Sequence, residues 1–579
     1  MKPLSGIDGA FLNLETPATP MHVGSLHLFQ TPPGYHRNFR DAVKRMIASR
    51  LHLAPIFRRR LAQMPLQFAN PVWVDGDVDF DYHIRRIDLP LPGSWQQLQD
   101  CVGKLHAEVL DRSQPLWMLY VFEGLASGDK AYYIKIHHAL LDGQAGAALA
   151  AALFDLSPVP ARAKPVVLQA EGSERRPGAL ALAAAAFRHD AVQYVKLVRH
   201  LPDVVRALAG LVVGGVKPAS RRRLPKTSIG GALWRNASFG PRTPFNAVIT
   251  GERSFAAATI PLDEVKAIAA AQEATVNDVV LALCSDALRR YLARHGGIPR
   301  KPLIATMPIS LRDPGNKEFT TQATLSLVSL ETHIADPVKR LQAIRAAAGA
   351  TKSVAKRARS IIPVDFPTIG GPWIIGVLAS MYGKTRIANA IPPIANVVIS
   401  NVPGPPVPLY VAGARMTGYW PLSIVEHGVG LNITLMSYVG ELGIGFTAAS
   451  CLIPEPQELV TDILAAHQEL QRHALPHAPR RPTPRKRAAA NAGKADAVPA
   501  LRPAQGRRGS RSMTAAPLAA VRNAPRKAAA LPATEKSGDA KTKSAAPLAA
   551  IRTAPRKAAA APGAAKPAHA KTKPVRARV

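Results

Sequence analysis

The stretch HHALLDG, residues 137–143, decides how the fold of this chain is read. Ahead of it, residues 116–124 and 131–136 are rich in aromatic and β-branched side chains, a composition typical of strands. Behind it, the Ala-rich residues 145–153 have the composition of a helix. The stretch therefore lies at a strand-to-helix turn in a mixed α/β region, where the chemistry of its side chains can be placed at the end of a strand.

Two adjacent histidines of this stretch, His137 and His138, are the candidate catalytic residues. A histidine has a pKa close to neutral pH, so that its neutral ring can accept a proton as a general base. Asp142 precedes the flexible Gly143, and three roles are open to it: to orient the imidazole, to bond a distant arginine, or to cap the following helix. Adjacent histidines on an extended segment point in opposite directions, which disfavours a metal site.

The sequence offers no obvious enzyme nucleophile. It has no G-x-S-x-G elbow, and Cys284 falls inside an apolar helical stretch where core packing is the favoured interpretation. Direct transfer is then the simplest mechanism. In this interpretation His138 takes a proton from an acceptor hydroxyl or thiol, which attacks an activated acyl group.

Residues 1–165 form the first expected domain, with helices at 41–53 and 96–110. Residues 235–475 form the second. Apolar periodicity there predicts helices at 263–271, 276–294 and 454–472 and strands at 303–309, 323–330, 395–400, 431–438 and 442–448. Between the domains, residues 166–234 mix apolar and basic side chains, which predicts a basic helical connector, either a membrane-surface helix or a solvated one.

The chain ends in a basic segment of low complexity, residues 476–579. It carries 24 Lys and Arg against three acidic residues, which is +21 of the chain's formal net charge of +35. It has no Phe, Trp or Tyr, and residues 515–530 recur almost unchanged at 545–560. Such a segment cannot bury enough apolar surface to offset the entropy of ordering, so we expect disorder. Its charge predicts binding to nucleic acid or other polyanions, and a solvated tether is the alternative.

The remaining composition limits where the protein works. The three cysteines are far apart, which excludes a disulfide scaffold and a cysteine-based zinc cluster and fits a reducing compartment. The first residues, MKPLSGID, lack the apolar region of a signal peptide. No apolar run reaches the ~18 residues of a membrane-spanning helix. These observations predict an intracellular protein that is soluble or peripherally bound to a membrane.

Several stretches outside the turn resemble the bacterial wax ester synthase/diacylglycerol acyltransferase family. In the family's order, the chain contains PLSGIDGAFLNLETPATPMHVGSL (3–26), LHLAPIFRRRL (51–61), Pro115-Leu116-Trp117, HHALLDG (137–143), PRTPFN (241–246), TVNDVVLA (275–282), MPISLR (307–312), Gly315-Asn316, NVVISNVPGP (396–405) and GYWPLSIVEHGVGLNITLMSY (418–438). HHxxxDG alone also occurs in chloramphenicol acetyltransferases, carnitine acyltransferases and peptide-synthetase condensation domains. The combination of stretches is therefore the selective signal, and it covers most of residues 3–470.

The resemblance implies an α/β fold of two chloramphenicol-acetyltransferase-like domains with a channel between them. It implies His138 as the catalytic base, His137 as its supporting neighbour, and Asp142 with Gly143 as the structural part of the motif. The implied reaction transfers a long-chain fatty acyl group from acyl-CoA to diacylglycerol, to a long-chain alcohol, or to both.

Two further sets of residues receive roles from the resemblance. Asn277 and Asp278 match the family's Asn-Asp pair and are expected near the domain interface, while Asn277 is also placed to cap a helix. Pro115, Leu116 and Trp117 are expected to line the acyl or alcohol channel. For Trp117 the alternative is ordinary core packing.

The implied partners are fatty acyl-CoA, as a substrate rather than a cofactor, and a lipid acceptor; no cofactor or metal is expected. Because both substrates partition into lipid, we expect a cytoplasmic protein held peripherally at the inner face of the plasma membrane or at lipid inclusions. One alternative is a related HHxxxDG acyltransferase with another acceptor. The other is a non-catalytic lipid-inclusion or anion-binding protein, which would have no need of an intact HHxxxDG motif.

Overall fold

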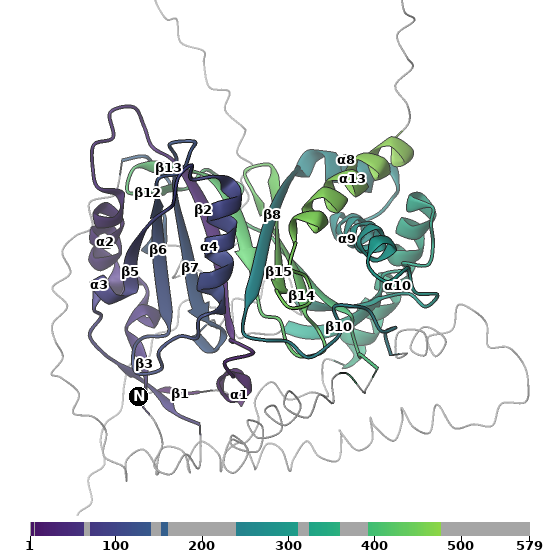
Figure 1. The fold of residues 1–579 in the computed structure, drawn as a ribbon, viewed down its shortest axis with the longest axis horizontal. Helices are drawn as coiled ribbons and strands as arrows, with labels where there is room; N and C mark the ends of the chain where they lie inside the picture. Colours follow the sequence, from purple (N-terminus) through teal and green to yellow (C-terminus); the bar gives the residue numbers. More distant parts are fainter. Residues whose placement is uncertain are drawn as a thin grey trace, which may run out of the picture. The chain divides into compact units, whose positions relative to one another are not determined.

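The structure is a computed structural model. It describes residues 2–4, 6–62, 70–140, 152–159, 239–310, 323–358, 389 and 392–475. These residues belong to a unit that spans residues 1–485. The expected connector, the basic tail and most of the helix expected at 145–153 lie outside the described residues. Two six-stranded sheets form the framework of this unit (Figure 1).

The first sheet has the strand order β12-β13-β2-β7-β6-β5. Its strands are β2 His22–Gln30, β5 Ile84–Asp88, β6 Trp117–Glu123, β7 Lys130–His137, β12 Tyr410–Val411 and β13 Ala414–Leu422. β5 and β6 run parallel, whereas every other neighbouring pair is antiparallel. The strands expected at 116–124 and 131–136 are confirmed as β6 and β7. Nearly all their residues are buried, because the sheet is covered on both faces.

Two strands of this first sheet come from the C-terminal part of the chain. β13 pairs with β2, with Arg415 opposite Gln30 and Leu422 opposite Gly24, and β12 follows at the edge. Both lie by sequence within the expected second domain. The division into domains at 1–165 and 235–475 stays a prediction. The structure shows that two strands from residues 235–475 complete the first sheet.

The second sheet has the order β10-β9-β11-β14-β15-β8. Its strands are β8 Arg253–Pro261, β9 Ile304–Ser310, β10 Ala323–Ser329, β11 Val397–Val402, β14 Leu431–Tyr438 and β15 Glu441–Ala449. β11 runs parallel to β9 and β14, and the other pairs are antiparallel. Five of these strands were expected from the sequence, and β8 was not.

Helices cover the two sheets. They are α1 Gly6–Leu14, α2 Phe39–Ser49, α3 Phe80–His83, α4 Trp95–Ala107, α8 Leu262–Ala271, α9 Val276–Arg294, α10 Pro337–Ala358 and α13 Gln457–Ala474, with 3-10 turns η1 Leu51–Leu53, η2 Pro55–Arg58 and η4 His138–Leu140. A small sheet of β1 Lys2–Pro3, β4 Val72–Asp75 and β3 Arg59–Ala62 has the order β1-β4-β3. The helix expected at 41–53 is α2, which begins earlier, at Phe39, and ends earlier, at Ser49; the 3-10 turns η1 and η2 follow it as far as Arg58.

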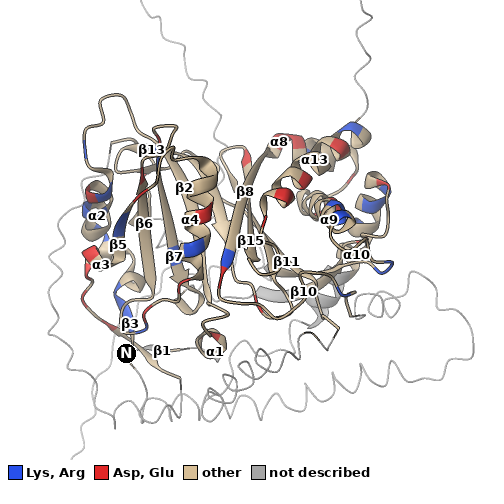
Figure 2. Ribbon diagram, viewed as in Figure 1, with Lys and Arg blue, Asp and Glu red and all other residues tan. Residues whose placement is uncertain are grey.

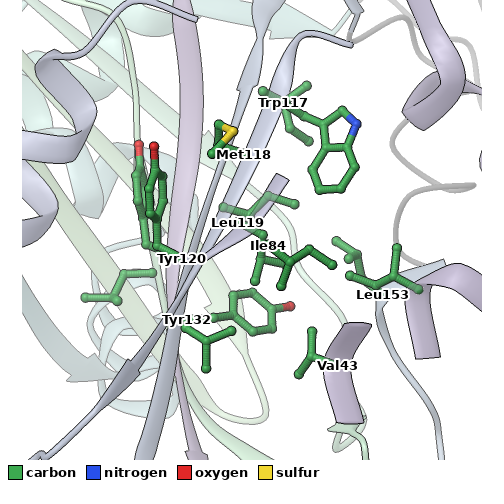
Figure 3. Packing of buried hydrophobic residues seen from close by; sticks show 14 of the residues in the cluster. Val43, Ile84, Trp117, Met118, Leu119, Tyr120, Tyr132 and Leu153 are labelled. Carbon is green, nitrogen blue, oxygen red and sulfur yellow. The ribbon is translucent and has the colours of Figure 1, made fainter. Parts of the chain in front are cut away.

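Each large sheet has its own hydrophobic core. In the first, Val43 of α2 packs in one cluster with Ile84, Trp117 and Tyr132 of the sheet (Figure 3). In the second, α9 is buried on nearly every side. Cys284 lies within α9 and is fully buried, as expected for a core residue, and burial raises the pKa of its thiol to about 12.

Close backbone contacts join the elements of the two sheets. β15 approaches β13 so closely that a Cβ on Gly445 would lie 1.8 Å from the carbonyl oxygen of Pro421. A Cβ on Gly103 of α4 would likewise lie 2.8 Å from the carbonyl oxygen of Arg253 on β8. Glycine is needed at both positions because only a residue without a side chain permits such an approach.

Charged residues gather mostly on helices and loops. The strands are largely uncharged, with basic residues visible on β3, β5, β7 and β8 (Figure 2). Among the described helices, none is by itself both long and apolar enough to cross a membrane. The pair α8 and α9 meets that criterion together, but it is bent by 102° and α9 belongs to the core.

Candidate active site

The histidine turn, His137 and His138, lies where β7 ends and η4 begins. The His137 amide donates to the Leu116 carbonyl oxygen at 3.0 Å, and the His138 amide donates to that of Met21 at 2.9 Å. These partners come from opposite sides of β7, since Leu116 directly precedes β6 and Met21 directly precedes β2. The backbone of the turn is therefore held by both neighbouring strands.

His138 is a residue of intermediate exposure whose ring is confined by a neighbouring aromatic side chain. It lies flat against the ring of Phe11 on α1, with 3.9 Å between centroids and 21° between planes. Burial lowers the pKa of His138 to about 4, and the neighbouring His137 contributes in the same direction, whereas an interaction with its own backbone acts in the opposite direction. The ring is thus neutral at physiological pH. A neutral imidazole has one ring nitrogen with the lone pair that a general base needs.

His137 is fully buried, and its tautomer follows from its contacts. Its Nδ1 accepts a hydrogen bond from the Ala139 amide at 3.1 Å, so in the neutral ring the proton must be on Nε2. That Nε2 lies 3.4 Å from Oε1 of Glu15. His137 therefore directs its Nε2 toward a carboxylate without forming a hydrogen bond with it.

Glu15 is the carboxylate of this site that sequence reasoning missed. Its side chain is only 2% exposed, and it accepts from the Met21 amide at 3.1 Å and from Arg112 Nη2 at 2.9 Å. Burial alone would raise the pKa of Glu15, but the contacts with His137, Met21 and Arg112 outweigh it and hold the pKa below its ordinary value. Glu15 is therefore a buried anion directed at the histidine turn.

The signal for Glu15 and Phe11 was present only in the family-like stretch at 3–26, which contains both residues. No local spacing connects that stretch to a turn more than a hundred residues later. The carboxylate singled out from the sequence, Asp142, and its neighbour Gly143 lie outside the described residues. Their expected roles stay predictions.

The Pro115-Leu116-Trp117 stretch supports the turn from the β6 side. Leu116 and Trp117 are fully buried in the first core. Trp117 Nε1 donates to the Phe57 carbonyl oxygen at 3.0 Å, and its ring stacks on His83. The described structure thus has Trp117 in core packing, which was the alternative interpretation. The expected role of this stretch in lining a channel stays a prediction. For Trp117 to line a channel, its side chain would have to leave the core contacts just described.

The Asn-Asp pair lies at the start of α9. The cap of this helix is Thr275, whose Oγ1 accepts from the Asp278 amide at 3.2 Å, while Asp278 accepts from the Thr275 amide at 2.9 Å. The interpretation of Asn277 as the helix cap is therefore wrong. Asn277 instead directs its Nδ2 to Met307 Sδ on β9, at 3.4 Å. Within the described residues, this pair forms no hydrogen bond or ion pair with the histidine turn, so its expected place in the site stays a prediction.

Two other family-like stretches have a structural role that the structure does show. Asn246 and Asn396 are buried and bond each other, with Asn396 Nδ2 donating to Asn246 Oδ1 at 2.7 Å. Asn246 also donates to the Gly428 carbonyl oxygen at 2.8 Å, and Asn396 accepts from the Ile304 amide at 2.9 Å. The pair thereby fastens the segment before β8 to β9 and to the loop before β14.

Over the parts of the chain that are described, no group of three or more His, Cys, Asp and Glu side chains is arranged to hold a metal ion. The arrangement that the turn does provide is a neutral imidazole, a second imidazole behind it, and a buried carboxylate. This set can remove a proton from a hydroxyl and stabilise the positive charge that the imidazole then acquires.

Comparison with known proteins agrees with this arrangement. The profile of the wax ester synthase/diacylglycerol acyltransferase catalytic domain matches residues 4–280, and that of the family's C-terminal domain matches residues 321–471. The chain belongs to the wax ester synthase/diacylglycerol acyltransferase family. It is accordingly an acyltransferase of the family that makes triacylglycerols and wax esters, as the sequence predicted.

The chain aligns with individual relatives over nearly the whole length of each relative. The O-acyltransferase WSD of Acinetobacter baylyi is 33% identical over 477 residues, which is 80% of this chain and 95% of that protein. A Mycobacterium tuberculosis protein provisionally assigned as a diacylglycerol O-acyltransferase is 35% identical, over 81% of this chain and 99% of its own. The solved wax ester synthase/diacylglycerol acyltransferase of Marinobacter aquaeolei VT8 has a TM-score of 0.58 at 27% identity, covering 82% of this chain and 100% of its own.

Proposed function

We propose that this acyltransferase moves a long-chain fatty acyl group from acyl-CoA to the hydroxyl of diacylglycerol or of a long-chain alcohol, with His138 as the general base. The observation that carries the proposal is the state of the His138 ring. It is neutral and stacked on Phe11, at a residue of intermediate exposure, and a neutral imidazole has one nitrogen that can accept a proton.

In the proposed reaction the acceptor oxygen gives its proton to His138 and attacks the thioester carbonyl carbon. A C–O bond forms and the C–S bond breaks, and the proton passes from His138 to the departing thiolate, which leaves as CoA. The imidazolium that exists between these steps is disfavoured by burial. Glu15, a buried anion next to His137, offsets part of that cost by electrostatic attraction across the turn.

The acceptor class is tested by offering both acceptors to one enzyme. Purified full-length protein receives one labelled long-chain acyl-CoA with equal amounts of diacylglycerol and hexadecanol in mixed micelles, and the neutral lipids are separated and counted. We expect triacylglycerol, wax ester or both, and about two to four orders of magnitude less of either ester from His138→Ala. Release of CoA without either ester would contradict the proposed acceptors.

We also propose that the protein works at a lipid surface in the cytoplasm, at the plasma membrane or at lipid inclusions. Supporting this are the lipid nature of both substrates and the basic residues Arg221, Arg222 and Arg223 in the connector, each of which would contribute about 1 kcal/mol near anionic headgroups. Replacement of all three by Ser should weaken binding to anionic vesicles. Unchanged binding across all contents of anionic lipid would exclude the connector from membrane contact.

The basic tail is proposed to bind polyanions, including nucleic acid, without a part in the chemistry. It supplies a net charge of +21 with no aromatic side chains to stack on bases, so its binding should weaken steeply as salt is added. Removal of residues 476–579 should leave acyl transfer in detergent intact and lower retention on DNA at low salt. Loss of acyl transfer in the shortened protein would contradict this division of roles.

A further inference from the structure

Behind the histidine turn, on the face of the first sheet that α4 covers, lies a buried cluster of polar side chains. His22 on β2 is the direct cross-strand partner of His137 on β7, so that both side chains stand on the same face of the sheet. His106, near the end of α4, meets the ring of His22 edge-on, with 4.8 Å between centroids. All three rings are at most 3% exposed. None of these three rings contacts substrate in the proposed mechanism. Only His137 has a part in it, as the support of His138.

The protonation of each ring follows from its partners. His22 Nε2 lies 2.6 Å from the His106 carbonyl oxygen, which can only accept, so His22 carries its proton on Nε2. His106 Nε2 donates in the same way to the Ser423 carbonyl oxygen at 3.1 Å, and its Nδ1 accepts from the Tyr133 hydroxyl at 2.6 Å. Burial lowers the pKa of His106 to about 3 and that of His22 well below its ordinary value, so both rings are neutral.

Two atoms of this cluster are left without a hydrogen-bond partner among the described residues: His22 Nδ1 and His137 Nε2. Because His22 carries its proton on Nε2, its Nδ1 is an acceptor; because His137 Nδ1 accepts from the Ala139 amide, its Nε2 is a donor. The 3.4 Å approach of Glu15 to the latter is too long for a good hydrogen bond. Buried polar atoms are nearly always paired, commonly through an internal water with two to four polar partners.

We propose that His22 is a positioning residue of the active site, which holds His137 through one internal water bonded to His22 Nδ1, His137 Nε2 and the Glu15 carboxylate. The water would accept from His137 and donate to the other two, which uses each group in its assigned role. The inference rests on the proposed function, because it explains how the neighbour of the base is fixed.

The same chain of bonds reaches the C-terminal part of the protein. His106 connects His22 to the backbone of Ser423, directly after β13. β13 is the strand that crosses into the first sheet. The orientation of His137 thereby depends on the correct docking of a segment almost three hundred residues away. This gives the buried histidines a role that a purely apolar core could not fill.

Two substitutions of His22 separate the proposed role from plain packing. His22→Asn can place an amide oxygen near the position of Nδ1 and keep the acceptor for the water, but it loses the bond to the His106 carbonyl. His22→Gln can place its amide nitrogen near Nε2 and keep that bond, but it loses the acceptor. If positioning through the water is the role, His22→Gln should lower kcat about ten- to hundredfold with KM little changed, and His22→Asn should lose clearly less.

A matched control is available on the same strand. His27 is also buried and neutral, but it faces the opposite side of the sheet, where it packs against Tyr132 and Tyr419. His27→Gln should lower the melting temperature as much as His22→Gln without a comparable loss of kcat. A double-mutant cycle completes the test: the effect of His22→Gln should vanish in a His137→Ala background, because His22 acts through His137.

The outcomes separate the two proposals. If His138→Ala abolishes transfer while His22→Gln and His27→Gln have equal kcat, the role of His22 is wrong and the proposed function stands. The role of His22 is also wrong if His22→Asn loses as much kcat as His22→Gln, or if the effect of His22→Gln persists unchanged without His137. If His138→Ala stays active, the proposed function itself fails, and with it the reason for positioning His137.

Discussion

The ring of Phe11 covers one face of His138, with 3.9 Å between the ring centroids. The two residues come from parts of the chain that are 127 positions apart, and they meet because α1 packs against η4, the turn that begins at His138. This contact keeps water from one side of the imidazole. It helps to explain why the pKa of His138 falls to about 4, for which burial is the main cause.

Replacement of Phe11 by Ala should therefore change the pH dependence of the reaction as well as its rate. Water would reach the ring, the pKa of His138 would rise toward the ordinary value of about 6.5, and the base would become protonated at higher pH. We expect kcat to fall about tenfold at pH 8 and further at pH 6. A pH–rate profile checks this. Phe11→Leu, which keeps an apolar cover, is the control, and an unshifted acid limb in Phe11→Ala would contradict the account.

The Glu15 carboxylate should matter for its charge. Glu15→Gln retains an acceptor for the Met21 amide but removes the negative charge that offsets the imidazolium, so kcat should fall about ten- to hundredfold while KM changes little. Glu123→Gln is the matched control, because Glu123 pairs with Lys130 in the same sheet and does not contact the turn. Steady-state kinetics on both variants measure the difference. Equal rates in the two variants would show that Glu15 has only a structural role.

The buried histidines predict a loss of stability in mild acid. His27 and His106 have pKa values lowered to about 3 and His138 to about 4, with burial as the main cause in each. Below about pH 6.5 these histidines bind protons in the unfolded chain but stay neutral in the folded protein. The stability that these residues contribute is complete above pH 6.5 and is lost as the pH falls toward 4, at up to about 1.4 kcal/mol per pH unit for each histidine.

Urea unfolding between pH 7.5 and 5 measures this slope. His27→Gln removes one such histidine away from the active site, so the slope of this variant should be smaller than that of the parent by about one proton. A stability independent of pH over this range would mean that the buried rings are protonated in the folded state.

The close approach of β15 to β13 predicts a strong effect of a single methyl group. In Gly445→Ala the new Cβ would lie 1.8 Å from the Pro421 carbonyl oxygen, so the strands must separate, at a cost of about 1–3 kcal/mol or more. Gly349→Ala is the control, because that helical glycine has no atom near the new Cβ and alanine should stabilise α10 by about 1 kcal/mol. Chemical denaturation of both variants tests the contrast. A Gly445→Ala protein as stable as the parent would contradict the tight contact.

Much of this fold was predictable from local patterns, because apolar residues recur along most helices and strands with the period of that element. β14 was predicted at 431–438 and α9 at 276–294, the bounds that the structure shows. β2 and β13 were missed for identifiable reasons. β2 contains the buried His22 and His27 and the partly buried Gly24, which are not typical of a strand, and β13 contains Gly418 and Pro421, which usually interrupt one.

The site was predictable only in part. The adjacent histidines marked the turn, since their chemistry is visible in seven consecutive residues. Glu15, Phe11 and His22 approach the turn only through strand pairing and the packing of α1, and no spacing in the sequence predicts those contacts. Local patterns identify the base, whereas the groups that set its pKa and orientation depend on tertiary structure.

The most direct test of the account is the rate of ester formation by His138→Ala, measured with saturating acyl-CoA and acceptor and with the melting temperature recorded beside it. Removal of the base should lower kcat by about two to four orders of magnitude in a protein that still unfolds cooperatively near the parent temperature. His137→Ala should lose less. A His138→Ala protein that forms ester at close to the parent rate would contradict the central claim that this imidazole accepts the proton of the attacking hydroxyl.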